Sequence, residues 1–334
     1  MNFIGMDIHK QFTVAIAKDK EGNKLAEDKF ENNRNNFENF LKVFKPEETK
    51  IVIESTSVWE HIYDMLEEMK YKTILANPTK TRAIAEARIK TDHVDANILC
   101  DLLRANLVAE SYIPPKEIRN LRNIMRQRKT IVKGQTQIKN KIHSVLLMNG
   151  ITLPYEGLCK KAIKWMLEEI KIETIKSVLS TYVALLEQYE LVLKKLEEKI
   201  KEIAEKNPQA VLLTTIYGVA EIRAMEIITE IGEINRFESS NKLCSYAGLI
   251  PGIKQSGTTI RFGRLVKQAN RNLKDVFIQT SWNLIRPKEN NRFRDFYLML
   301  SKKKGKQKAI CAVARKLCCV VYAMLRKNQE FMLL

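Results

Sequence analysis

Four acidic residues have the types and spacing that could support chemistry on phosphate. Asp7 and Glu54 each follow a short apolar run, and Asp92 and Asp95 lie three residues apart in the segment 90–104. On a helix, a spacing of three places both carboxylates on one face. Such a pair also fits a solvated acidic face with an N-terminal cap. Because two further acids stand at strand ends, and clustered like charges need a cation between them, the pattern favours a divalent-metal site.

The elements that must position these acids follow from the apolar pattern of residues 1–112. Short β-prone runs predict strands at residues 3–6, 12–17, 24–30, 51–53 and 72–76. Amphipathic stretches predict helices at residues 36–44, 58–69 and 90–104. Three strands followed by alternating helices and strands is the element order of an α/β RNase H-like fold. Asp7 would then leave the first strand beside Glu54 on the fourth, with the helix of Asp92 and Asp95 packed over that edge.

Four converging carboxylates would suit a two-metal site for phosphodiester chemistry. Two ions about 4 Å apart activate the attacking oxygen and stabilise the leaving oxygen. Mg²⁺ prefers such all-oxygen sites, and we expect Mn²⁺ to substitute for it. His9 and His93 flank the acids in sequence. We expect each to be a surface residue or to lie behind the metal ligands rather than to bind the metal, because hard Mg²⁺ prefers oxygen ligands.

Composition points to a polyanionic partner. The chain has 334 residues, which predicts two or three domains, and a net charge of +18. Residues 261–334 hold 18 Lys and Arg against 4 Asp and Glu, so most of the excess lies there. The six cysteines form no CxxC or zinc spacing. With neither a leader-like start nor a run of ~20 apolar residues, we expect a cytoplasmic protein that does not contact membranes.

Residues 113–207 have the pattern of a helical linker. Basic residues crowd its first helix at Arg119, Arg122, Arg126, Arg128 and Lys129, which predicts a face that contacts a nucleic-acid backbone. Lys80, Arg82, Arg88 and Lys90 could contact phosphates too, or form a solvated face. From Ile172 to Ile203, apolar residues alternate steps of three and four, which predicts a self-associating coiled coil or one helix of an intramolecular hairpin.

Residues 208–334 form the third predicted domain, which is mostly helical. Gly218 lies in a segment that resembles a helix-hairpin-helix, although Ala220 occupies the place of its second glycine. Ser256-Gly257 stands in a polar loop before a set of cations, Arg261, Arg264, Lys267, Arg271 and Lys274. An exposed serine among cations has the ingredients of a phosphoryl-transfer nucleophile, although Ser-Gly is also typical of a simple turn.

Four motifs together resemble a known family. They are GMDIHK at 5–10, IEST at 53–56, KTDHVDA at 90–96, and YAGLIP at 246–251 with the following Ser256, Arg264 and Lys267. In this order they are similar to the DEDD-type insertion-sequence transposases, the bridge-RNA-guided recombinases related to the Piv DNA invertase. The resemblance covers essentially the whole chain. The sequence departs from the family pattern at Ala269, where glycine is common, and at Lys274, where arginine is common.

The resemblance implies a RuvC-like site made of Asp7, Glu54, Asp92 and Asp95, and a Ser256 that becomes joined to DNA. It also implies a coiled-coil linker, a dimer or tetramer with a composite site between subunits, and a structured noncoding RNA beside donor and target DNA in a bacterial nucleoid. Phosphate contacts are expected from a set of basic residues, Arg119, Arg122, Arg126, Arg261, Arg264, Lys267 and Arg271. The alternatives are a RuvC-like nuclease or junction resolvase with a structural Ser256, a site-specific DNA invertase, and a non-catalytic scaffold.

Overall fold

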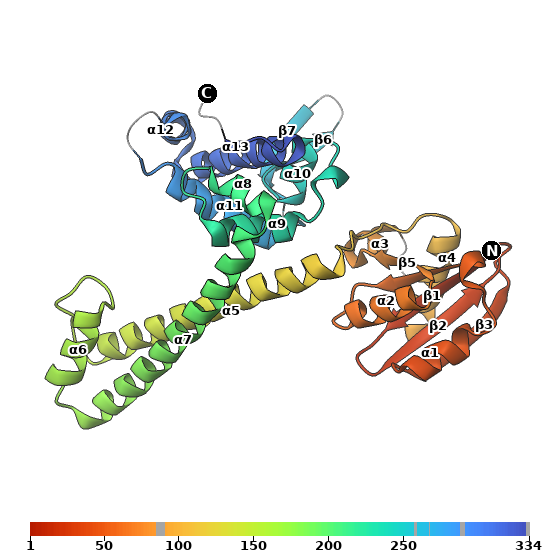
Figure 1. The fold of residues 1–334 in the computed structure, drawn as a ribbon, viewed down its shortest axis with the longest axis horizontal. Helices are drawn as coiled ribbons and strands as arrows, with labels where there is room; N and C mark the ends of the chain where they lie inside the picture. Colours follow the sequence, from red (N-terminus) through yellow and green to blue (C-terminus); the bar gives the residue numbers. More distant parts are fainter. Residues whose placement is uncertain (85–90, 257–258, 267, 288–290, 332–334) are drawn as a thin grey trace. The chain divides into compact units, whose positions relative to one another are not determined.

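The computed structural model describes residues 1–84, 91–256, 259–266, 268–287 and 291–331 (Figure 1). The chain divides into two compact units, residues 1–113 and residues 114–334. Among the described residues, no helix combines the length and the apolar composition needed to cross a bilayer.

The N-terminal unit is built on one five-stranded sheet. Its strands are β1 (Asn2–Ile8), β2 (Phe12–Lys18), β3 (Lys24–Glu31), β4 (Thr49–Glu54) and β5 (Lys72–Ala76). The spatial order is β3-β2-β1-β4-β5; the first three strands are antiparallel, and β4 and β5 run parallel to β1. The mixed α/β character expected of this part is therefore confirmed.

Helices cover both faces of this sheet. They are α1 (Arg34–Leu41), α2 (Trp59–Glu68), α3 (Pro78–Ile84), α4 (Asp92–Arg104) and the short η1 (Pro46–Glu48). Successive strand residues point to opposite faces, so Ile4 and Met6 join the core under α1 and α2. Phe3 packs instead with Leu99 and Cys100 of α4. Asp7 has the same parity as Phe3, which places it on the α4 face.

The C-terminal unit is mostly helical, as its patterns predict. Its elements are α5 (Lys116–Met148), α6 (Lys160–Glu169), α7 (Glu173–Glu205), α8 (Pro208–Thr214), α9 (Glu221–Ile231), η2 (Ile234–Arg236), α10 (Ser240–Tyr246), β6 (Pro251–Ser256), β7 (Thr259–Leu265), α11 (Arg271–Leu284), α12 (Arg292–Lys304) and α13 (Lys306–Lys327). Helices α5 and α7 form a long hairpin in which α7 runs back along α5 (Figure 1).

This helical hairpin explains why apolar residues recur at steps of three and four along α7. The heptad residues Ile175, Leu179, Leu186 and Ile200 are buried within the unit. At Gly134 of α5, an added Cβ would lie 2.7 Å from the Tyr189 hydroxyl oxygen, so the two helices approach closely there. The intramolecular hairpin anticipated as one alternative is thus present, and the apolar residues that suggested self-association are largely engaged inside the chain.

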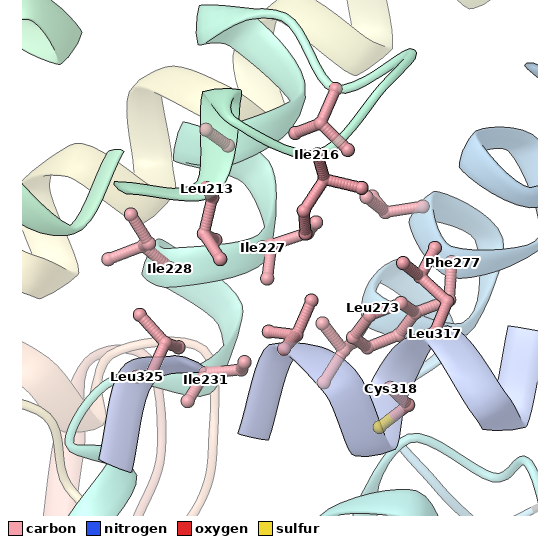
Figure 2. Packing of buried hydrophobic residues seen from close by; sticks show 14 of the residues in the cluster. Leu213, Ile216, Ile227, Ile228, Ile231, Leu273, Phe277, Leu317, Cys318 and Leu325 are labelled. Carbon is pink, nitrogen blue, oxygen red and sulfur yellow. The ribbon is translucent and has the colours of Figure 1, made fainter. Parts of the chain in front are cut away.

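The main core of the C-terminal unit surrounds α9. Residues 224–231 of this helix are all buried, and its apolar side chains, such as Ile227 and Ile231, share one core cluster with residues of α8, α11 and α13 (Figure 2). The turn between α8 and α9 needs Gly218, whose φ of 78° is in the region that favours glycine. Two helices joined by a turn at Gly218 are therefore present, and α9 is the centre of the unit. The helix-hairpin-helix resemblance of this segment stays a prediction.

Candidate active site

The end of β1 and the start of α4 bring two of the predicted acids together. Asp7 is the penultimate residue of β1, and Asp92 opens α4. Thr91 caps that helix, since its side chain accepts a hydrogen bond from the Val94 N–H at 3.2 Å. The cap fixes where the helix begins, and the first turn then carries both Asp92 and Asp95. The partial positive charge of a helix N-terminus favours carboxylates at this position.

His9 lies between the two carboxylates. Its Nε2 is 3.1 Å from Asp7 Oδ2 and 3.2 Å from Asp92 Oδ1, and the ligand atoms of the three residues all lie within 4.8 Å of one another. The tight turn after β1 holds the ring, because the His9 N–H donates to the Phe12 carbonyl at 2.9 Å and the two rings stack. His9 was expected on the surface or behind the ligands; in the structure it lies between Asp7 and Asp92 and contacts both.

The electrostatics around Asp7 are those of crowded carboxylates. This residue is only 6% exposed. Burial raises the pKa of its carboxyl, His9 opposes that rise, and the charges of Asp95 and Asp92 add to it. The charge of Asp95 is therefore close enough to act on the Asp7 carboxyl group. Such a group of acids has a free-energy cost that a bound cation would offset.

Glu54 ends β4 on the strand next to β1. The parallel register pairs Met6 with Ile53, so the next step along both strands sets Glu54 beside Asp7. Glu54 is half-buried and has a polar or charged partner of its own. The four acids thus occupy the ends of β1 and β4 and the first turn of α4. Among the described residues, the ligand atoms that lie within 4.8 Å of one another are those of Asp7, His9 and Asp92, and this group does not include Glu54 or Asp95. Carboxylate oxygens are the ligands that Mg²⁺ and Mn²⁺ prefer, and His9 adds one nitrogen donor.

Gly5 permits the approach of α4 that forms this site. A Cβ built on Gly5 would lie 2.3 Å from the Ala96 carbonyl oxygen and 2.5 Å from the Cys100 backbone nitrogen. These atoms belong to the helix backbone, so the whole of α4 would have to move. Gly5→Ala is expected to lower the free energy of unfolding by about 2 kcal/mol and to displace Asp92 from Asp7.

Denaturant unfolding and a metal-dependent cleavage assay check this expectation. Gly252→Ala is the matched control, because the nearest atom to an added Cβ there, the Arg264 carbonyl oxygen, is 3.6 Å away. If Gly5→Ala keeps both the stability and the activity of the parent, the close helix–strand contact does not build the site.

The basic residues of α5 have roles that the sequence did not reveal. Arg119 is buried, and its Nε donates to the Pro114 carbonyl at 3.1 Å. Arg122 Nε donates to the Thr229 carbonyl at 2.9 Å. Arg126 forms two hydrogen bonds with Glu230, at 2.9 and 3.0 Å. These guanidiniums thus bind internal acceptors of the C-terminal unit, a role that the sequence did not predict. Contact of this face of α5 with phosphate stays a prediction.

The serine predicted as nucleophile lies on a hairpin rather than in an irregular loop. Ser256 is the last residue of β6, and its Cα pairs with that of Thr259 on β7. Arg261 pairs with Lys254 along the same ladder. Arg261, Arg264 and Arg271 are exposed. Lys267, which is expected to bind phosphate, lies outside the described residues. So do Arg88 and Lys90, for which phosphate contact and a solvated face were both left open.

Comparison with known proteins bears on both units. A family model described as "Transposase" matches residues 4–149, and a model described as "Transposase IS116/IS110/IS902 family" matches residues 210–298. The chain is 23% identical to the putative transposase y4qE of Sinorhizobium fredii over 80% of this chain and 73% of the relative. It is also 23% identical to the transposase for insertion sequence element IS1111A of Coxiella burnetii, over 84% of this chain and 79% of the relative.

A shorter similarity links the chain to a DNA-inverting protein. It is 30% identical to the pilin gene-inverting protein of Moraxella bovis over 129 residues, which is 38% of this chain and 40% of the relative. The motifs that suggested DEDD-type transposases thus agree with independent matches to both parts of the chain. The protein belongs to the IS110/IS116/IS902 family of insertion-sequence transposases.

Proposed function

We propose that this transposase cuts and rejoins DNA strands through a phosphoserine intermediate, using a metal site formed by Asp7, Glu54, Asp92 and Asp95. The observation that carries the proposal is the convergence of Asp7 and Asp92, from β1 and α4, within 4.8 Å of each other at His9. The β3-β2-β1-β4-β5 sheet order supports an RNase H-like fold for this unit. Bound Mg²⁺ would supply positive charge to the phosphate oxygens that react.

The chain's own groups would perform the transfer. The Ser256 hydroxyl oxygen forms a bond to phosphorus, its proton passes to a base such as one of the carboxylates, and the P–O bond to the 3′ oxygen breaks. The freed 3′ hydroxyl of another strand then attacks the phosphoserine, so the bond energy is conserved and ATP is not required. Arg261 and Arg264, both exposed on β7, are suited to neutralise the phosphate.

The experiment that tests this function is a strand-exchange reaction. Purified protein is combined with DNA carrying the ends of its element, a target duplex, Mg²⁺ and RNA transcribed from the flanking sequence. Joined donor–target molecules are the expected product. Cut DNA that never rejoins would favour the second candidate, a RuvC-like metal-dependent nuclease, because a carboxylate cluster alone suffices for hydrolysis.

A structured noncoding RNA is part of the proposed complex. If the RNA is the guide, base pairing between the RNA and DNA selects the target, and the protein needs no sequence-specific contacts with DNA. The positive net charge of the chain is consistent with binding to the nucleic-acid backbone in this way. Sequencing the nucleic acid that copurifies with the protein, expressed beside its native flanking DNA, tests this partner. We expect one discrete RNA species encoded beside the gene; recovery of random cellular RNA would contradict the guide role.

Exposed cations of the C-terminal unit are proposed to contact phosphates. Replacing Arg261 or Arg271 by Ala is expected to weaken DNA binding uniformly across sequences and to reduce the slope of log K against log salt by about 0.9. Arg34→Ala is the control, because this exposed arginine pairs with Glu38 and Glu68 on the other unit. Affinity measured across a salt series gives the slope. An unchanged slope in the Arg261 and Arg271 variants would mean that these residues face only solvent.

Self-association is proposed to use a second stripe on α7. Val178, Leu185 and Val192 recur every seven residues and are 44%, 44% and 49% exposed. They lie apart from the seam that faces α5, so they suit a second copy of the chain. The double variant Leu185→Asp and Val192→Asp should therefore reduce a dimer or tetramer to monomers while the fold is kept.

Light scattering measures the mass of the parent and of this variant. Leu186→Asp is the informative contrast, because Leu186 is only 2% exposed and its replacement should unfold the hairpin itself. A monomeric parent, or a double variant that keeps the mass of the parent, would exclude this stripe as the interface.

A further inference from the structure

A buried carboxylate on the central helix of the C-terminal unit has an unusual number of partners. Glu230 of α9 is 3% exposed. Burial alone would raise the pKa of this carboxyl, yet hydrogen bonds from Arg126 and Asn270, together with the charges of Arg126 and Arg122, lower it below its ordinary value. Glu230 is therefore a charged group inside the protein, held in that state by its partners.

Two hydrogen-bond partners of Glu230, Asn270 and Asn272, lie at the start of α11. Asn270 Nδ2 donates to Glu230 Oε2 at 2.8 Å, and Asn272 Nδ2 donates to Oε1 at 3.2 Å. Asn270 is also the N-cap of α11, because its Oδ1 accepts from the Leu273 N–H at 3.0 Å. One asparagine thus fixes the first turn of α11 and attaches it to Glu230.

Asn270 also contacts Tyr246, the residue that precedes the segment containing β6 and β7. Its N–H donates to the Tyr246 carbonyl at 2.8 Å, and its Nδ2 lies 3.2 Å from the Tyr246 hydroxyl. Tyr246 ends α10, so residues 247–269, which include β6 and β7, leave and return at one point. An added Cβ on Gly248 would lie 2.6 Å from Ala269 Cβ, which shows how closely the two flanks approach.

We propose that Glu230 is a positioning residue for Ser256. Through Asn270 and Tyr246 it fixes the base of the β-hairpin formed by β6 and β7, in which Ser256 is the last residue of β6. The inference rests on the proposed function, in which Ser256 attacks phosphorus. A nucleophile must be held close to its attack geometry, and a displacement of about 1 Å can slow a reaction by roughly 100-fold. The anchor itself is rigid, because Arg126 of α5 binds both oxygens of Glu230.

A neighbouring glutamate provides the matched control. Glu226 lies one turn earlier on α9 and is 7% exposed. It too is paired with arginines, Arg128 at 3.2 Å and Arg223 at 2.5 Å. These arginines belong to α5 and α9 rather than to the flanks of the hairpin. Glu226→Gln should therefore cost stability by the same mechanism as Glu230→Gln without releasing the hairpin base.

The test compares Glu230→Gln with Glu226→Gln by two readouts. Hydrogen–deuterium exchange of residues 247–269 should become faster in Glu230→Gln and stay near the parent rate in Glu226→Gln. The rate of covalent protein–DNA adduct formation, measured at DNA concentrations that saturate each variant, should fall by about 10- to 100-fold in Glu230→Gln only. Equal exchange and equal adduct rates in the two variants would overturn the positioning role.

A second variant keeps the test decisive if Glu230→Gln does not fold. Asn270→Ser retains a side-chain oxygen that can cap α11 but loses the Nδ2 donor to Glu230. It should reproduce the faster exchange and the slower adduct formation, and the double variant should be no worse than either single one. Parental exchange in Asn270→Ser would overturn the anchor. A parent protein that forms no adduct would instead overturn the proposed function, while the exchange data still decide whether Glu230 holds the hairpin.

Discussion

Asp7→Asn and Asp92→Asn should each abolish DNA strand cleavage, with a loss of about a thousand-fold or more. Each change removes one charged oxygen donor from the group that converges at His9. A thousand-fold loss corresponds to about 4 kcal/mol of transition-state stabilisation. End-labelled DNA incubated with each variant in Mg²⁺ and resolved on a denaturing gel measures the effect.

The fold should survive these two changes. Burial and neighbouring acids raise the pKa of Asp7, so its ionised form is disfavoured in the native state. A neutral amide relieves that cost, and at neutral pH the free energy of unfolding should stay the same or rise slightly. Asp28→Asn, on the exposed strand β3, is the control and should keep full activity. Full recombination by both site variants would rule out the carboxylate site.

Ser256→Ala is expected to lose all covalent adduct and all strand cleavage, yet to keep DNA and RNA binding. A serine hydroxyl is the group proposed to bond to phosphorus, and alanine offers no replacement. Ser256→Cys should retain a trace of activity, since a thiolate can still attack. The control is Ser245→Ala, an exposed serine on α10, which should behave as the parent. Nicking by Ser256→Ala at the parental rate would make water the nucleophile.

Much of the N-terminal unit could be predicted because its signals are local. The short apolar runs mark all five strands, and the spacing of Asp92 and Asp95 is enough to place both acids on one helix face. The position of His9 between Asp7 and Asp92 was not predicted. Mg²⁺ was expected to bind oxygen ligands, so histidine was not considered as part of the site. Its closeness to Asp7 in sequence, across the turn into β2, was the available signal.

The C-terminal unit was harder to predict because its decisive contacts are distant in sequence. Arg126 and Glu230 are separated by 104 residues, so a basic helix that binds internal acids looks the same as one that binds DNA. The hairpin of β6 and β7 was expected as a loop, because its Gly, Pro and polar residues hide the alternation typical of strands. The apolar period of α7 was identified, but periodicity alone does not say whether the partner helix belongs to the same chain.

The covalent intermediate is tested most directly by locating the DNA on the protein. The parent is incubated with its DNA and Mg²⁺, denatured, digested with nuclease and protease, and analysed by mass spectrometry. We expect a peptide in which Ser256 carries a nucleotide, absent without divalent metal and absent in Asp7→Asn. Cleaved DNA with no nucleotide-linked peptide, or a nucleotide on another residue, would contradict the phosphoserine mechanism.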